Sequence, residues 1–325
     1  MENKLFEPIK VGRFHAKNRF VRSATKEELC DRAGHLPDEL YNIYEEFVDG
    51  GVGTIIVSSA RVKLLDGTKH GGLLRLDNPD VLPEYAKLAR LGKKNNCTML
   101  IQATYTHKDI DNLTICDIDK IVDEFVDAAK FVEKAGFDGL QIHAAHTVFM
   151  SYILSPKYNH RTDEYGQNKN LLAERIVKAI RKNTNENFII MMKINCQDFD
   201  EEGLQEEDSL RYCIRLAELG IDAIEVSGND PIKNDRNEEC YFWEFASRLK
   251  RSISIPVILV GGVKNLETIT RLNKEENIDM FSMSRALTCE PDLVNRWHNG
   301  DVTKAKCLSC NACLNTHAHA CILRK

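Results

Sequence analysis

The sequence predicts an α/β protein folded as a closed (β/α)8 barrel, and three observations lead to this prediction. Eight short apolar runs recur along the 325 residues, each followed by a longer amphipathic stretch. The apolar runs are continuous, which is typical of parallel strands covered on both faces. No Pro/Ser-rich linker or change of composition divides the chain. Eight such repeats suit a closed barrel better than an open, doubly wound sheet.

The predicted strands are the eight apolar runs, and helices fill the intervals between them. The runs are Phe20–Ala24, Thr54–Ser59, Met99–Thr104, Gly139–Ala144, Phe188–Asn195, Ala223–Ser227, Pro256–Val260 and Met280–Ser284. Residues 118–135 carry one apolar stripe at a period of 3.6, which predicts a helix. A helix over residues 38–48 follows Pro37, and Gly136 and Gly220 are predicted helix stops. The loosely alternating segment 5–14 contains Gly12 and predicts a hairpin that closes the barrel floor.

Composition narrows the class of protein. Of the residues, 43% are hydrophobic and 29% are charged, and 44 basic residues against 49 acidic ones give a formal charge of −5. This balance argues against nucleic acid as a partner. No apolar run reaches the ~18 residues that a membrane span needs, and the first residues lack the plan of a signal peptide. We therefore expect a cytoplasmic protein without a membrane partner, and a homo-oligomer is compatible with the sequence.

We predict that residues 1–303 form the barrel and that residues 304–325 form a cysteine-rich C-terminal tail, not a separate domain. In such barrels the functional site forms where the strands end. Polar or small residues do follow or end the predicted strands: Ser23, Ala24, Thr25, Ser59, Gln102, His143, His146, Lys193, Gly261, Gly262, Ser284 and Arg285. We expect these side chains to meet at one rim.

Two loops at this rim predict a phosphate-bearing ligand. Gly261-Gly262 and Ser284-Arg285 follow the seventh and eighth strands, whose loops often bind phosphate in barrels. Glycines let backbone N–H groups approach phosphate oxygens, and arginine adds a bidentate fork. No Gly-x-Gly-x-x-Gly follows the first strand, so a dinucleotide-binding fingerprint is not supported.

His143 and His146 are separated by two alanines at the end of the fourth strand. Two imidazoles three residues apart can donate hydrogen bonds to one carbonyl oxygen and stabilise the negative charge that it develops. Two core histidines with satisfied hydrogen bonds are an equally open interpretation. A zinc site is less favoured because no third ligand stands close in the sequence.

Five stretches of the chain resemble the Old Yellow Enzyme family, which includes the barrel domain of dienoyl-CoA reductases. They are Leu-Phe-Glu-Pro-Ile from residue 5, Asn-Arg-Phe-Val-Arg-Ser-Ala-Thr from 18, Phe-Asp-Gly-Leu-Gln-Ile-His-Ala-Ala-His from 137, Leu-Ser-Pro-Lys-Tyr-Asn-His-Arg-Thr-Asp-Glu-Tyr-Gly from 154 and Val-Ile-Leu-Val-Gly-Gly from 257. The resemblance implies a TIM barrel that holds FMN at the strand ends. It also implies NADH or NADPH as reductant and an electron-poor alkene as substrate.

The resemblance assigns roles to the rim residues. Ser23, Ala24, Thr25 and Ser59 would line the flavin, Gln102 would bond its pyrimidine edge, and Lys193 would stand near N1. Gly261, Gly262, Ser284 and Arg285 would hold the phosphate. His143 and His146 would grip the substrate carbonyl while hydride passes from flavin N5 to the alkene. The family's usual proton-donating tyrosine is replaced by Val148, so water, Tyr105 or Tyr152 would supply the proton.

The tail carries Cys307, Cys310, Cys313 and Cys321. Thiolates at this spacing can hold a [4Fe–4S] cluster or zinc, and the resemblance implies a cluster with similar cysteines. The intervals here are shorter than in those relatives, so a cluster is not favoured over a tail without metal. Zinc, with His317 and His319 nearby, is the remaining alternative.

The predicted function is therefore an FMN-dependent, NAD(P)H-using oxidoreductase that reduces the C=C bond of an α,β-unsaturated carbonyl. Two alternatives remain open. One is a non-catalytic or electron-transfer flavoprotein, suggested by Val148 and the cysteine tail. The other is a non-redox barrel aldolase or isomerase that uses the phosphate loops for a phosphorylated substrate.

Overall fold

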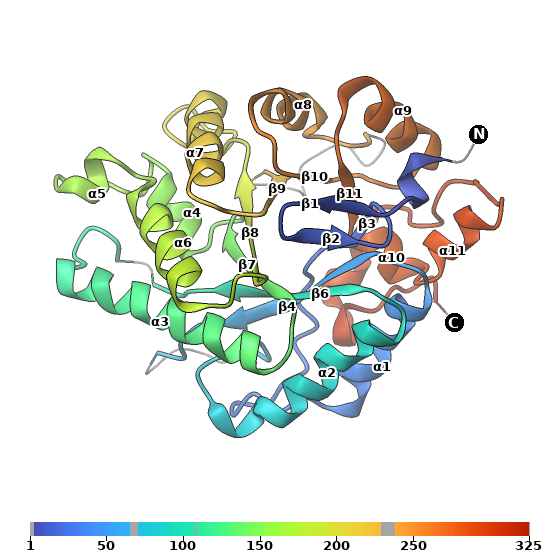
Figure 1. Ribbon diagram of the computed structural model, residues 1–325, viewed down its shortest axis with the longest axis horizontal. Coiled ribbons are helices and arrows are strands. Elements are labelled where there is room, and N and C mark those ends of the chain that lie inside the picture. Colours follow the sequence, from blue (N-terminus) through green and yellow to red (C-terminus); the bar gives the residue numbers. More distant parts are fainter. Residues whose placement is uncertain (1–2, 66–70, 108, 229–237, 325) are drawn as a thin grey trace.

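The computed structural model describes residues 3–65, 71–107, 109–228 and 238–324, and a closed barrel of parallel strands dominates it (Figure 1). The barrel strands are β3 (Phe20–Arg22), β4 (Thr54–Arg61), β6 (Thr98–Thr104), β7 (Gly139–Ala144), β8 (Ile189–Asn195), β9 (Ala223–Ser227), β10 (Val257–Val260) and β11 (Met280–Met283). β3 pairs with both β11 and β4, which closes the sheet. The short β5 (Leu74–Arg75) adds to the end of β4. The predicted (β/α)8 barrel is confirmed.

Helices connect the strands and surround the barrel. They are α1 (Asp38–Asp49), α2 (Leu82–Lys94), α3 (Ile115–Lys134), α4 (Phe149–Leu154), α5 (Glu164–Gln167), α6 (Leu171–Asn183), α7 (Glu206–Glu218), α8 (Trp243–Ser252), α9 (Leu266–Glu276), α10 (Arg285–Cys289) and α11 (Leu293–His298). Short 3-10 turns lie at Lys4–Phe6, Pro79–Val81, Ala312–Asn315 and His317–His319.

The helix boundaries follow the capping residues. α3 begins three residues before the predicted 118 because Thr114 accepts a hydrogen bond from the amide of Asp117, and the Asp117 carboxylate accepts one from the amide of Thr114. Gly136 and Gly220 follow α3 and α7 with φ of 85° and 94°. Glycine adopts this left-handed backbone at little cost, which explains why both helices stop where predicted.

The N-terminal hairpin closes the floor of the barrel. β1 (Ile9–Val11) pairs with β2 (Phe14–Ala16), and Gly12 makes the turn with φ of 59°. Phe14 packs in one apolar cluster with residues from the beginnings of the barrel strands, among them Val21, Ile56 and Leu100. The predicted hairpin is confirmed, and because it fills the floor, ligand access is from the opposite end.

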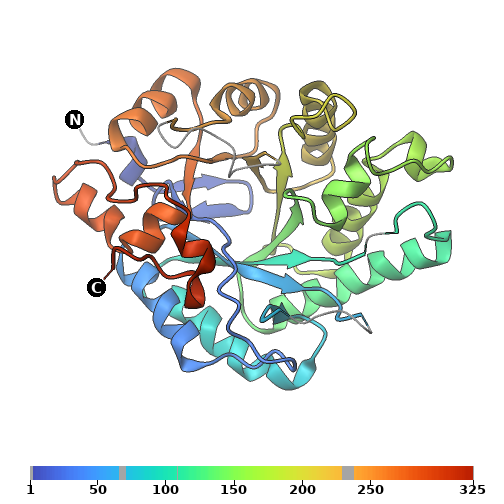
Figure 2. The same ribbon diagram turned by 180° about the vertical axis from the view of Figure 1, so that it is seen from behind.

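The tail lies across that opposite end, as the view from behind shows (Figure 2). The amide of Ala305 donates to the carbonyl of Lys264 at 2.9 Å, next to the loop after β10. Farther on, His317 and Arg324 contact Glu39 and Glu46 of α1 at 2.9 and 2.7 Å. In the part of the chain that the structure describes, no helix combines the length and apolarity that a membrane crossing requires.

Candidate active site

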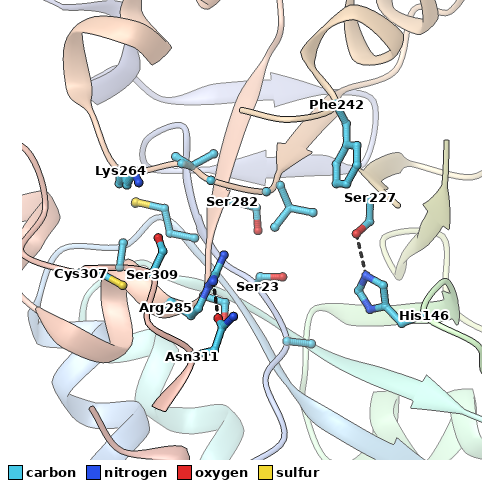
Figure 3. Close-up of a pocket in the computed structure, with 18 of the residues that line it drawn as sticks. Ser23, His146, Ser227, Phe242, Lys264, Ser282, Arg285, Cys307, Ser309 and Asn311 are labelled. Carbon is cyan, nitrogen blue, oxygen red and sulfur yellow. Dashed lines mark hydrogen bonds between the residues drawn. The ribbon is translucent and has the colours of Figure 1, made fainter. Parts of the chain in front are cut away.

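A cavity opens at the end of the barrel where the strands terminate (Figure 3). It encloses about 980 Å³, a volume that includes the mouth open to solvent. Eight of the residues predicted from the sequence line it: Ser23, Ala24, His146, Lys193, Gly261, Gly262, Ser284 and Arg285. The strand ends therefore do bring these side chains together, although they are up to 262 positions apart in the sequence.

Four predicted residues lie next to this cavity or behind its lining. Thr25 contacts Ser284, with 2.8 Å between the two hydroxyl oxygens. Ser59 and Gln102 are buried and stand opposite each other on β4 and β6, after a register shift that begins at Val57. His143 is buried beside Lys193 in the pairing of β7 with β8.

The loops after β10 and β11 form one side of the cavity. Gly261 and Gly262 have φ of 108° and 68°, and a Cβ on either would stand within 2.9 Å of the Tyr241 ring. The backbone at these two positions therefore carries no side chain and packs closely against the Tyr241 ring. The Arg285 guanidinium donates to the Asn311 side chain across the loop. Bare backbone and a guanidinium fit a phosphate group.

Sequence reasoning missed three polar residues on the same side. Lys264 is buried, lines the cavity and stands two positions after Gly262. Ser309 and Asn311 line it from the tail. The position of Lys264, two residues after the glycine pair, was a usable signal. The tail residues gave none, because only the folded chain brings them back to β10 and β11.

Lys193 ends in a polar network inside the barrel. Its ammonium group donates to the Ser23 hydroxyl at 2.7 Å and lies 3.3 Å from the Glu225 carboxylate. Glu225 in turn accepts from Gln141, whose side-chain oxygen accepts from Gln102. The signal for Glu225 was a lone acid within the apolar run of β9, which is unusual in a strand buried on both faces. Gln102 and Lys193 thus belong to one connected group.

The two histidines stand together as the spacing predicts. Their ring centroids are 5.6 Å apart and the rings are inclined by 79°. His146 adopts a left-handed backbone with φ of 59°, and its Nε2 lies 2.7 Å from the Ser227 hydroxyl. The buried Nδ1 of His143 has no hydrogen-bond partner among the described residues. An unpartnered polar atom of this kind fits a ligand better than a satisfied core histidine.

Both imidazoles are neutral near pH 7. Burial lowers the pKa of His143 well below its ordinary value, and the charges of His146 and Lys193 lower it further. Burial and then Lys193 lower the pKa of His146 to about 3. A neutral imidazole donates one N–H, so the pair can present two donors to a carbonyl oxygen without carrying charge of its own.

These pKa values predict how stability depends on pH. Above about pH 6.5 both histidines are neutral in the folded and unfolded states. As the pH falls below 6.5, the two histidines become protonated in the unfolded chain but stay neutral in the folded chain. The free energy of unfolding therefore decreases on acidification. Each histidine is expected to lower the free energy of unfolding by about 1.4 kcal/mol per pH unit, and for His146 this continues down to its native pKa of about 3.

Urea unfolding between pH 7 and pH 5 measures this slope. The H146A variant should lose stability on acidification less steeply than the wild type. Equal slopes for the wild type and H146A would contradict the prediction.

The tail cysteines lie close to the cavity, which Cys307 lines. Burial raises the pKa of Cys307 and Cys313, and the charges of neighbouring tail thiols act on both. All eleven cysteines are free. Within the described residues, no group of three or more His, Cys, Asp or Glu side chains is arranged to hold a metal ion.

Neither tyrosine predicted as a proton donor lines the cavity. The Tyr105 hydroxyl donates to Glu124 of α3 at 2.8 Å, away from the histidines. Tyr152 on α4 packs against Tyr158, with ring centroids 4.6 Å apart. Val148 caps α4 and offers no proton.

Comparisons with known proteins agree with this geometry. The chain is 25% identical over 374 residues to a 4,4'-dithiodibutanoate disulfide reductase of Rhodococcus erythropolis, covering 96% of this chain and 92% of that protein. It is also 25% identical over 342 residues to an NADH oxidase of Thermoanaerobacter brockii, covering 94% of this chain but 52% of that protein. A 2-naphthoyl-CoA reductase structure superposes with a TM-score of 0.89 at 19% identity, over 99% of this chain and 57% of that one. The chain thus spans about half the length of several relatives.

A closed barrel with a cavity and a histidine pair at its open end fits the class of barrel oxidoreductases that use a flavin. A sequence model of the NADH:flavin oxidoreductase / NADH oxidase family matches residues 106–303. The chain belongs to this family. The resemblance seen in the sequence is therefore confirmed, and redox chemistry is favoured over an aldolase or isomerase.

Proposed function

We propose that this protein binds FMN in the cavity and uses NADH or NADPH to reduce the C=C bond of an α,β-unsaturated carbonyl. One observation carries the proposal. A single cavity joins the anion-binding loops, the Lys193 cation and His146, with His143 immediately behind it. The loops suit a phosphate group, and Lys193 suits a ring that gains electrons. The two histidines suit a substrate carbonyl.

The residues that would hold FMN divide into two groups. Gly261, Gly262, Ser284 and Arg285 would hold the phosphate, assisted by Lys264 from the same side of the cavity. Ser23, Ala24, Thr25, Ser59, Gln102 and Lys193 would hold the ring. When bound, FMN supplies a ring that takes hydride from NAD(P)H and gives it to the β-carbon of the substrate.

His143 and His146 bind the substrate carbonyl oxygen. Because burial and the nearby lysine keep both rings neutral, each ring has one N–H to donate and carries no charge of its own. The two donors stabilise the negative charge that the oxygen develops as the β-carbon accepts hydride. Ser227 orients the His146 ring from the other side through the contact at 2.7 Å.

The proton that reaches the α-carbon comes from water in this proposal. Tyr105 is committed to Glu124, and neither Tyr105 nor Tyr152 lines the cavity. The cavity opens to solvent at the end of the barrel, which gives water a route to the substrate.

We further propose that residues 304–325 serve as part of the cavity wall, since Cys307, Ser309, Asn311 and Leu314 line it. Iron and zinc analysis, combined with an absorption spectrum of the purified protein, tests this assignment. A stoichiometric metal content would instead support a [4Fe–4S] cluster or zinc on the four tail cysteines. The closeness of Cys307 to the cavity also favours an electron-transfer flavoprotein as the second candidate function.

Anaerobic mixing experiments test the proposed function. FMN-loaded protein should lose its flavin absorbance with NADH or NADPH and regain it when 2-cyclohexenone is added. Bleaching without reoxidation by any enone would favour the electron-transfer alternative. Failure to bind FMN, or to be reduced by either nicotinamide, would contradict the proposal.

A further inference from the structure

Glu225 is the centre of the polar network beneath the cavity. It lies on β9, and its side chain is fully buried. Its carboxylate accepts from the Ser23 hydroxyl at 2.9 Å, the Ser282 hydroxyl at 2.6 Å and the Gln141 amide at 2.8 Å. The ammonium group of Lys193 stands 3.3 Å away.

All but one of these partners face the cavity. Ser23, Ser282 and Lys193 line it, whereas Glu225 itself lies behind them. The fourth partner, Gln141, links Glu225 to Gln102, because the side-chain oxygen of Gln141 accepts a hydrogen bond from the Gln102 amide at 2.8 Å. One carboxylate therefore fixes three lining side chains directly and sets the orientation of the Gln102 amide through a relay.

The carboxylate is held ionised. Burial alone would raise the pKa of Glu225, but Lys193 and the hydrogen bonds from Ser282, Gln141 and Ser23 bring it below the ordinary value. A buried ion pair of this kind is weak evidence for stability, since apolar residues of similar volume would often serve as well. Its position directly beneath the cavity suggests a role in what the cavity binds.

We propose that Glu225 is a positioning residue that orients Lys193 and Gln102 toward the flavin and, by offsetting the charge of Lys193, sets the reduction potential of the flavin. This inference rests on the proposed function. Reduction adds negative charge to the flavin, and a cation near the ring favours that state. A carboxylate 3.3 Å from the cation opposes the same effect. Glu225 therefore holds the potential lower than Lys193 alone would set it.

The E225Q variant tests the effect of the Glu225 charge separately from the effect of the side chain's shape. Glutamine keeps the size and hydrogen-bonding oxygen of the side chain but removes its charge, so the potential is expected to rise. The expected shift is tenfold or more in the ratio of reduced to oxidised flavin, which is about 30 mV for a two-electron couple. The E225D variant keeps the charge and should stay near the wild-type potential. Spectroelectrochemistry of the FMN-loaded protein measures all of these values without any substrate.

Glu290 supplies the matched control. It is a buried glutamate that pairs with Arg296 at 3.2 Å and does not line the cavity. The E290Q variant should therefore leave the potential unchanged. An equal shift in E290Q and E225Q would show that loss of any buried carboxylate acts through the fold, and it would overturn the proposal.

The pair K193Q and K193Q/E225Q extends the test if E225Q does not fold, because the double variant leaves neither buried charge without its partner. K193Q alone should lower the potential, and adding E225Q should raise it again. The same potential in both variants, or an unshifted E225Q that binds FMN normally, would overturn the proposal while leaving the proposed function intact. A wild-type protein that binds no FMN would overturn both.

Discussion

Replacing His143 or His146 by alanine is expected to lower kcat/KM for 2-cyclohexenone by about 100- to 1,000-fold. Loss of one preorganised donor to a developing oxyanion commonly has an effect of this size. Both rings are neutral donors that the fold holds in place, so a mobile water molecule is a poor replacement for either of them. Reduction of the flavin by NADH or NADPH should change much less, because that step involves no substrate carbonyl.

Separate measurement of the two half-reactions by anaerobic stopped flow tests this expectation. The H15A variant, on the hairpin at the barrel floor, should behave as the wild type in both. Enone reoxidation that is equally fast in H143A, H146A and wild type would refute the role given to the pair. A loss confined to flavin reduction would also refute it.

Replacing Arg285 by alanine is expected to weaken FMN binding by about 10- to 100-fold, which corresponds to the loss of one charge-assisted hydrogen bond. Arg285 is half-buried at the rim of the cavity, and its guanidinium donates a hydrogen bond to the Asn311 side chain. R285K should bind with intermediate affinity, since lysine keeps the charge but lacks the bidentate fork. Quenching of FMN fluorescence on titration with apoprotein measures the Kd.

Arg271 on α9 provides the control for this variant. It is exposed and forms a surface pair with Glu275 at 3.4 Å. R271A removes the same charge from the protein and should leave the Kd unchanged. A Kd for R285A equal to that of the wild type would mean that the loops after β10 and β11 do not hold the phosphate.

The barrel was predictable because each of its strands is buried on both faces. A continuous apolar run such as residues 189–195 leaves little choice but a parallel strand covered by helices. The rim was predictable for a related reason, since the side chains that follow such runs must share one end of the barrel. His146 and Arg285 were found in this way.

Other features depend on contacts that no local pattern records. Glu225 appears in the sequence as one acid within an apolar run, and only the closed barrel shows that Lys193, Ser23 and Gln141 all point at it. The return of the tail to the cavity depends on contacts such as that of Ala305 with Lys264. Predicting the strands one by one therefore identifies the residues at the rim. It does not identify the polar network around Glu225 or the tail residues that line the cavity.

A crystal structure of the FMN complex tests the central claim most directly. It should show one FMN molecule in the cavity, with its phosphate on Gly261, Gly262 and Arg285 and its ring in contact with Lys193 and Gln102. FMN bound elsewhere on the barrel, or bound in the cavity without contact to Lys193 and Arg285, would contradict the account.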